Sequence, residues 1–160
     1  MALAKICGLS TPETVAAALA GKAAYVGFMF FEKSPRNIAP DVAARLAAAA
    51  RGKAKIVAVT VDPSDALLRE LTDTLRPDFI QLHGRETPAR VREAAMRTGA
   101  GTIKVISIGE ESDLDKLAEF EAVADVAAVA VANEHGDLRA GRTGVRREIP
   151  RAKLDRKSVV

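Results

Sequence analysis

The chain has 160 residues, of which 48% are hydrophobic, 28% charged and only 4% aromatic, so we expect one globular domain with a core of Ala, Val, Leu and Ile. The net charge of +3 is uneven: residues 136–160 carry eight basic and three acidic side chains, and the first 135 residues sum to −2. This distribution argues against a nucleic-acid-binding protein. The apolar runs are too short to cross a membrane.

Short apolar runs typical of buried strands alternate with helix-like segments along the first 125 residues. The strand runs lie at 3–7, 23–30, 55–61, 78–82 and 102–108, and a sixth strand is expected at 125–133. The helix-like segments lie at 10–21, 39–52, 62–76, 86–99 and 111–124. Their expected N-terminal signals are Ser10 or Thr11, Pro40 with Asp41, Asp62 or Ser64, Thr87 with Pro88, and Ser112.

This alternation predicts an α/β fold of parallel βαβ units, in which functional residues gather beyond the carboxyl ends of the strands. The candidates there are Cys7-Gly8, 31–36, 61–63, His83-Gly84 and 107–109. From residue 133 the strand pattern stops and arginines and glycines become frequent. We therefore divide the chain into a barrel-like domain, 1–132, and an irregular basic tail, 133–160, that is disordered or aberrant.

Cys7 is the only cysteine, which excludes an internal disulfide and fits a reducing cytoplasm; we expect no signal peptide. A buried cysteine is most often a small hydrophobic residue of the core. The position of Cys7 at a strand end favours a catalytic role instead, because Gly8 would let a substrate approach the backbone and the helix that follows would favour the thiolate form. Position alone leaves both interpretations open.

Three other polar residues stand out. Arg36 follows Ser34-Pro35 in a strand-to-helix loop, where a guanidinium is either a solvated cation or a clamp for a carboxylate or phosphate. His83 shares one side of its strand with Gln81, so the pair is expected at the mouth of a barrel unless His83 is a structural histidine. Lys104 lies in an apolar strand, either paired with a carboxylate in the barrel interior or extended to solvent.

The spacing of His and Cys predicts no metal site, and the glycines form neither a dinucleotide-binding nor a Walker loop.

The blocks "KICG", "GFMFFEKSPR" and "QLHG", in this order, resemble phosphoribosylanthranilate isomerase of tryptophan biosynthesis from residue 3 to about 125. The resemblance implies a (βα)8 TIM barrel without metal or organic cofactor and a small phosphorylated substrate. It implies Cys7 as general base, Arg36 as the anthranilate carboxylate contact, and His83 as a lining residue of an Amadori isomerase.

Two features depart from that family. Its general acid, an Asp after the sixth strand, has no counterpart here before Asp137, and its phosphate-binding loops belong to the seventh and eighth units. Because eight units need roughly 200 residues or more, we expect an incomplete barrel of five to six units, from a truncated or frameshifted family member. Translating the coding DNA in its other frames tests that hypothesis.

Three functions follow as alternatives. The chain is an active isomerase, a catalytically impaired remnant whose open sheet edges allow self-association, or a module that binds anions through Arg36 and the basic tail.

Overall fold

The computed structural model describes residues 3–108, 113–132 and 138–145. In these ranges strands and helices alternate as the sequence predicts. The elements are β1 (Lys5–Cys7), α1 (Pro12–Ala20), β2 (Tyr25–Phe30), α2 (Pro40–Ala48), β3 (Lys55–Thr60), α3 (Asp65–Thr74), β4 (Phe79–Leu82), α4 (Pro88–Thr98), β5 (Gly101–Ile108), α5 (Asp113–Glu121), β6 (Val126–Ala132) and β7 (Leu138–Val145).

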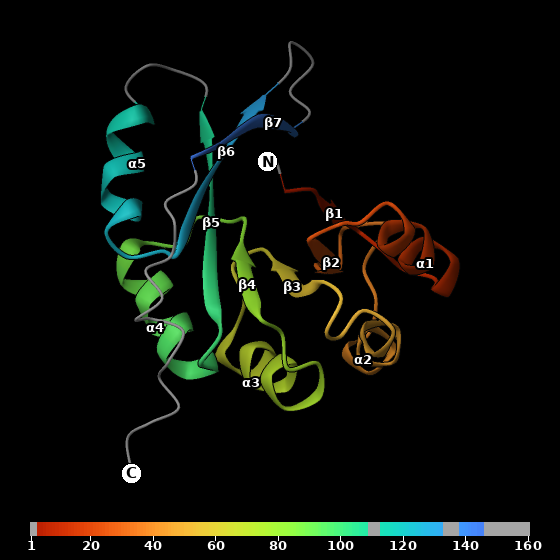
Figure 1. Ribbon diagram of the computed structural model, residues 1–160. Coiled ribbons are helices and arrows are strands. Elements are labelled where there is room, and N and C mark those ends of the chain that lie inside the picture. Colours follow the sequence, from red (N-terminus) through yellow and green to blue (C-terminus); the bar gives the residue numbers. More distant parts are fainter. Residues whose placement is uncertain (1–2, 109–112, 133–137, 146–160) are drawn as a thin grey trace.

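The strands form one sheet in sequential order, with β1 to β6 parallel and β7 antiparallel to β6. The helices follow one another around the outside of the strands, from α1 beside β1 to α5 beside β6 (Figure 1). Parallel strands joined by helices on one side curl into a barrel wall. The described part of the chain is therefore an incomplete TIM barrel of five βα units and a sixth parallel strand, which confirms the predicted fold class.

Local capping decides where the helices begin. The Thr11 side chain accepts a hydrogen bond from the Thr14 amide at 3.3 Å, so Thr11 rather than Ser10 caps α1. Ser64 rather than Asp62 caps α3, and Thr87 caps α4 as expected. The expected cap of α5 at residue 112 lies outside the described residues. The second helix ends at Ala48, before the glycine at 52 that its sequence pattern favours as the end.

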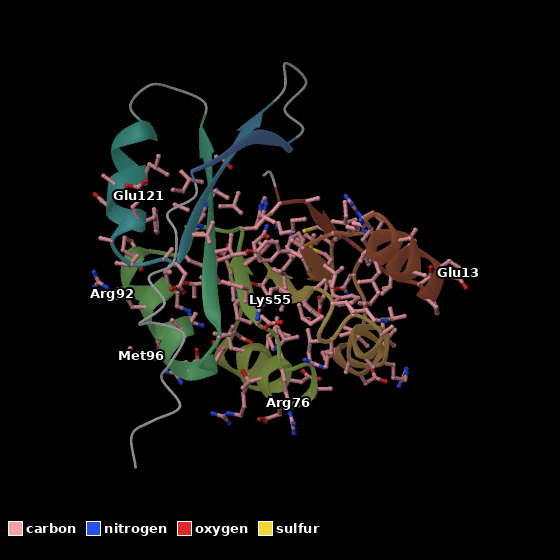
Figure 2. The ribbon with its side chains drawn as sticks, viewed as in Figure 1. Glu13, Lys55, Arg76, Arg92, Met96 and Glu121 are labelled. Carbon is pink, nitrogen blue, oxygen red and sulfur yellow. The ribbon has the colours of Figure 1, made fainter. Side chains whose placement is uncertain are left out.

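Successive side chains of each strand point to opposite faces of the sheet, and this divides the core into two layers. Between sheet and helices lies a large cluster that includes Phe28, Ile56 and Leu71, each fully buried. On the concave face of the sheet lies a smaller cluster of Val57, Val59, Phe79 and Ile103. The outer helix surface faces away from both layers: Arg92 and Met96 of α4 point outward, and Met96 is 79% exposed (Figure 2).

Strand β7 differs from the sequence-based expectation of an irregular segment after residue 132. It pairs with β6 in the antiparallel register Val131↔Arg139 and Ala132↔Leu138, with a shift between Ala128 and Ala130. The backbone groups along the free edge of β6 can pair with a segment of any side-chain pattern, so hydrophobic periodicity gives no signal for β7. Residues 133–137 and 146–160 lie outside the described residues, and the domain boundary after 132 stays a prediction.

Candidate active site

The carboxyl ends of β1 to β6 lie at one edge of the parallel sheet, which places the candidate residues of successive strands together. Cys7 is the last residue of β1 and pairs in register with Gly27 of β2. His83 directly follows β4, and its amide donates to the Thr60 carbonyl of β3 at 2.9 Å. Residues 76 positions apart thus reach the same end of the barrel wall because parallel strands share one direction.

The Cys7 thiol lies on the concave face of the sheet. Cys7 is half-buried and packs against the cluster of Val57, Val59 and Phe79. Its sulfur lies directly over Gly27, where an added Cβ would come within 2.7 Å of Sγ. The missing side chain of Gly27 therefore makes the space that the thiol occupies, and Cys7 faces the barrel interior rather than the helices.

Arg36 lies beside Cys7 because its side chain crosses Gly8. A Cβ on Gly8 would lie 2.5 Å from Arg36 Cδ, and the φ of +77° at Gly8 favours glycine as well. The sequence suggested that Gly8 leaves room for substrate, but the structure fills that room with the Arg36 side chain. The guanidinium itself stays exposed, so its donors remain open to an anionic ligand.

Hydrogen bonds hold the loop that presents Arg36. The Phe31 amide donates to Asn37 Oδ1 at 2.8 Å, and the Arg36 amide donates to Ser34 Oγ at 3.2 Å. The Ile38 amide then donates to the Met29 carbonyl of β2 at 3.1 Å. The loop therefore leaves and rejoins the end of β2, which fixes the base of the Arg36 side chain.

Gln81 faces the concave side, as the sequence predicts for this strand. It is 4% exposed, pairs in register with Val59, and accepts a hydrogen bond from the Lys5 ammonium. Lys5 was not among the residues that sequence reasoning selected. The signal was present, because Lys5 precedes Cys7 by two residues and alternation places both on the same face.

His83 is half-buried at the end of β4. Burial is the main cause that lowers its pKa from the usual value, and the nearby charges of Lys5 and Lys104 lower it further, whereas Glu86 opposes them. The imidazole is therefore neutral at neutral pH, when it can both donate and accept a hydrogen bond.

Lys104 is buried and paired with a carboxylate, as one of its two interpretations predicts, but the barrel-interior location given with that interpretation was wrong. Its ammonium lies 2.7 Å from Glu86 Oε2. The pair faces the helix layer rather than the barrel interior, because the ammonium lies 5.5 Å from the centre of the Phe120 ring of α5. Sequence reasoning did not identify Glu86, since nothing in the strand pattern shows which loop carboxylate reaches a lysine.

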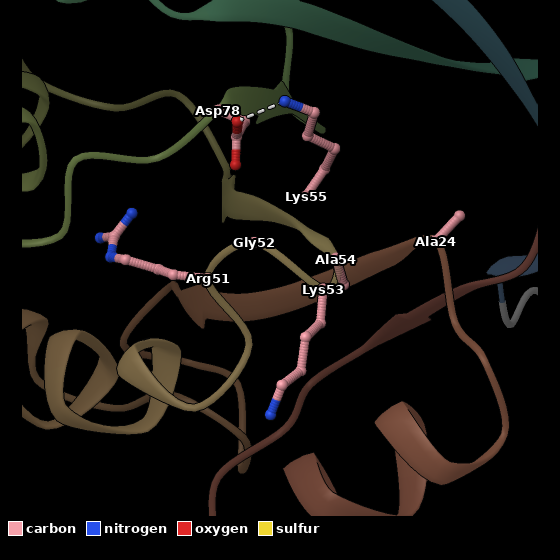
Figure 3. A pocket seen from close by; sticks show the side chains of 7 residues that line it. All are labelled: Ala24, Arg51, Gly52, Lys53, Ala54, Lys55 and Asp78. Carbon is pink, nitrogen blue, oxygen red and sulfur yellow. Dashed lines mark hydrogen bonds and ion pairs between the residues drawn. The ribbon is translucent and has the colours of Figure 1, made fainter.

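A hollow in the described part of the structure lies at the opposite end of the strands. It has a volume of about 390 Å³ and is lined by Ala24, Arg51, Gly52, Lys53, Ala54, Lys55 and Asp78 (Figure 3). Lys55 is bonded to Asp78 at 2.9 Å, and the Arg51 guanidinium donates to the backbone carbonyls of Leu75 and Arg76. Because these cations already have partners, the hollow is a weaker candidate site than the edge that holds Cys7.

Comparison with known proteins identifies the family of the chain. The sequence model of the N-(5'-phosphoribosyl)anthranilate isomerase family matches residues 4–146. The chain belongs to this family. The match continues past residue 125, where the motif resemblance was expected to end, so that boundary was wrong.

Individual relatives of this isomerase family give the same result. The N-(5'-phosphoribosyl)anthranilate isomerase of Caulobacter vibrioides is 55% identical over 144 residues, which are 89% of this chain and 66% of that protein. The Brucella canis isomerase is 56% identical over 121 residues, 76% of this chain and 54% of that protein. The chain thus spans between about half and two thirds of the length of these relatives.

Solved structures of the family share the fold. The phosphoribosylanthranilate isomerase of Thermotoga maritima superposes with a TM-score of 0.77 at 26% identity, covering 89% of this chain and 67% of that one. A second solved phosphoribosylanthranilate isomerase, in complex with reduced 1-(o-carboxyphenylamino)-1-deoxyribulose 5-phosphate, gives a TM-score of 0.75 at 25% identity, covering 82% of this chain and 66% of that one.

Proposed function

We propose that this chain converts N-(5'-phosphoribosyl)anthranilate into 1-(2-carboxyphenylamino)-1-deoxyribulose 5-phosphate, the isomerisation step of tryptophan biosynthesis. The observation that carries the proposal is the Arg36 side chain lying against Gly8, the residue that follows Cys7, at the carboxyl end of β1. A solved family member binds a reduced form of that product, which supports a small phosphorylated substrate for this chain as well.

Cys7 is the general base of the proposed reaction. In its deprotonated form the sulfur takes the proton from the sugar carbon next to the imine. The electron pair of the broken C–H bond then forms a carbon–carbon double bond, and the protonated imine nitrogen takes up the electrons of the C=N bond to become a neutral amine. The resulting enolamine gives the ketone product by proton transfer. A thiol suits this step because its deprotonated form can act as a base towards a proton on carbon.

Arg36 orients the substrate in this scheme. Its planar guanidinium can bind the anthranilate carboxylate through two parallel hydrogen bonds, which sets both distance and orientation. The ordered loop around Asn37 holds the arginine beside the thiol. His83 lines the same edge as a neutral group that exchanges hydrogen bonds with the substrate.

A weakly active or inactive chain is the second candidate. The sequence of β6, Val126–Ala132, consists of Val and Ala alone, so it offers no carboxylic acid to protonate the ring oxygen as the sugar opens. Loss of a general acid costs about 10²–10⁴-fold in rate. Asp137, the first Asp after β6, lies outside the described residues.

Complementation of a tryptophan auxotroph separates the two candidates. Growth restored by this chain and lost with Cys7→Ala supports the isomerase, and product formation by the purified protein should fall in parallel. An Arg36→Ala variant should raise KM more than it lowers kcat, because it removes a binding contact. If neither the chain nor the Cys7→Ala variant restores growth, the weakly active or inactive chain is the correct alternative.

We also propose that two copies associate through the edge of β1. In the described part of the chain β1 pairs only with β2; Ile6 within the strand is 42% exposed, and Leu3, which precedes it, is 51% exposed. An unpaired strand edge with apolar side chains invites pairing with another chain. Sedimentation velocity should show a concentration-dependent dimer that Ile6→Lys weakens, and a strictly monomeric protein contradicts the proposal.

No helix in the described part of the chain is both long enough and apolar enough to cross a membrane. We propose that the protein works in the cytoplasm and has neither a membrane nor a nucleic-acid partner. The lone cysteine and the negative sum of charges over the first 135 residues support this assignment. Cell fractionation tests the location.

A further inference from the structure

A buried ion pair lies beside His83, outside the residues that the proposed reaction uses. Lys104 Nζ and Glu86 Oε2 are 2.7 Å apart, and the two side chains are 4% and 1% exposed. Burying two charges costs so much hydration that an apolar pair of similar size often stabilises a protein equally well or better. Stability alone therefore does not account for this pair, and its other contacts indicate what it does.

The Glu86 carboxylate binds the backbone of two loops. Its Oε1 accepts a hydrogen bond from the Asp62 amide at 2.9 Å, and the Gly84 amide donates to both carboxylate oxygens, to Oε1 at 3.1 Å and to Oε2 at 3.0 Å. Lys104 donates to the Gly84 carbonyl at 2.7 Å as well as to the carboxylate. The pair thus joins the loop after β3, the loop after β4 and strand β5 at the edge of the sheet that holds Cys7.

The two loops that Glu86 joins are in direct contact. A Cβ on Gly84 would lie 2.4 Å from Asp62 Oδ1, and the Arg85 amide donates to the same oxygen at 2.7 Å. Asp62 has a φ of +44°, a left-handed conformation that the surrounding hydrogen bonds must hold. A shift of Gly84 therefore moves Asp62, and it also moves His83, which directly precedes Gly84 in the chain.

We propose that Glu86 and Lys104 are positioning residues that fix His83 at the mouth of the site by holding the backbone of Asp62 and Gly84. The acceptor atoms of Glu86 carry this role, and Lys104 keeps the carboxylate in place. The kinetic consequence rests on the proposed isomerase function, whereas the placement of the loops does not.

Two double variants of the full chain separate positioning from simple stability. Glu86→Gln/Lys104→Met removes both charges but keeps a side-chain oxygen where Oε1 now accepts both amides. Glu86→Leu/Lys104→Met replaces the pair with apolar side chains of similar size and keeps no acceptor. The readouts are the amide proton shifts of Asp62 and Gly84, the ring signals of His83 with His135 as internal reference, and kcat and KM.

The first variant should keep the two amide shifts, the His83 ring signals and kcat of the natural chain. The second should remain folded, lose the downfield shifts of both amides, alter the His83 signals, and lower kcat about tenfold to a hundredfold with little change in KM. If both folded variants keep the natural amide shifts and kcat, the pair is only structural and the proposal is overturned.

Two further outcomes are decisive as well. If Glu86→Leu/Lys104→Met does not fold, Glu86→Gln/Lys104→Met decides. The proposal is overturned if this variant loses the natural amide proton shifts of Asp62 and Gly84. It is supported if the variant keeps these shifts and the natural ring signals of His83. If the natural chain shows no turnover, the proposed isomerase function fails, and the amide and ring signals alone decide whether the pair positions His83.

Discussion

Gly27 makes the space for the Cys7 thiol, and Gly27→Ala tests whether that space matters. The added Cβ would lie 2.7 Å from Cys7 Sγ and 3.3 Å from both Cys7 Cα and Val59 Cγ2. The sulfur contact is roughly 1 Å shorter than an ordinary van der Waals separation. The backbone cannot retreat, because β2 is paired with β1 on one side and β3 on the other. We therefore expect the thiol to leave its place.

The expected cost in stability is modest. Overpacking costs about 1–3 kcal/mol, and replacing a glycine inside a strand returns about 0.5–1 kcal/mol, so the free energy of unfolding should fall by about 1 kcal/mol. The thiol should become more exposed on the concave face. Since Cys7 is the only cysteine, a thiol-specific disulfide reagent reports on it alone, and its rate should rise. Urea denaturation measures the stability.

Gly21→Ala is the matched control, because the atom nearest to a Cβ there would be the Ala17 carbonyl oxygen at 3.4 Å, an ordinary van der Waals contact, and the φ of −73° suits alanine. This variant should leave the thiol rate unchanged. If Gly27→Ala shows the same thiol rate and the same stability as the natural chain, the thiol does not lie over Gly27. The proposed arrangement of the site would then be wrong.

Four further substitutions test the fold and the electrostatics. Leu71→Ala, at a fully buried position of α3, should lower the free energy of unfolding by about 2–5 kcal/mol in urea. Thr11→Ala should cost about 1 kcal/mol and Ser10→Ala much less, because Thr11 makes the capping bond; equal costs would contradict the capping assignment. The folded chain holds the pKa of His83 below its usual 6.5, so the unfolded chain takes up the proton first as pH falls. Stability should therefore fall as the pH drops through 6.5 and towards the lower folded-state pKa, and His83→Gln should reduce that loss; an unchanged loss would show that burial of His83 is not its cause.

The sequence predicted the order and type of the elements well, because each carries a local signal. Strands were visible as short apolar runs, and helix starts as Thr87 or Ser64 with the residues around them. Short motifs around Cys7, Arg36 and His83 predicted the family and the edge of the sheet that holds these residues. These features depend on neighbours in the chain and on the shared direction of parallel strands, so one sequence suffices to find them.

Contacts between distant segments could not be predicted in this way. The sequence shows a lysine at position 104, but only the tertiary structure brings Glu86 to it, places Arg36 across Gly8, and pairs Lys5 with Gln81. It also adds β7, which pairs through backbone groups that hydrophobic patterns do not reveal. Local propensity and periodicity determined which elements form. The three-dimensional packing of loops far apart in the chain decided which side chains meet, because such contacts depend on geometry that no neighbouring residue encodes.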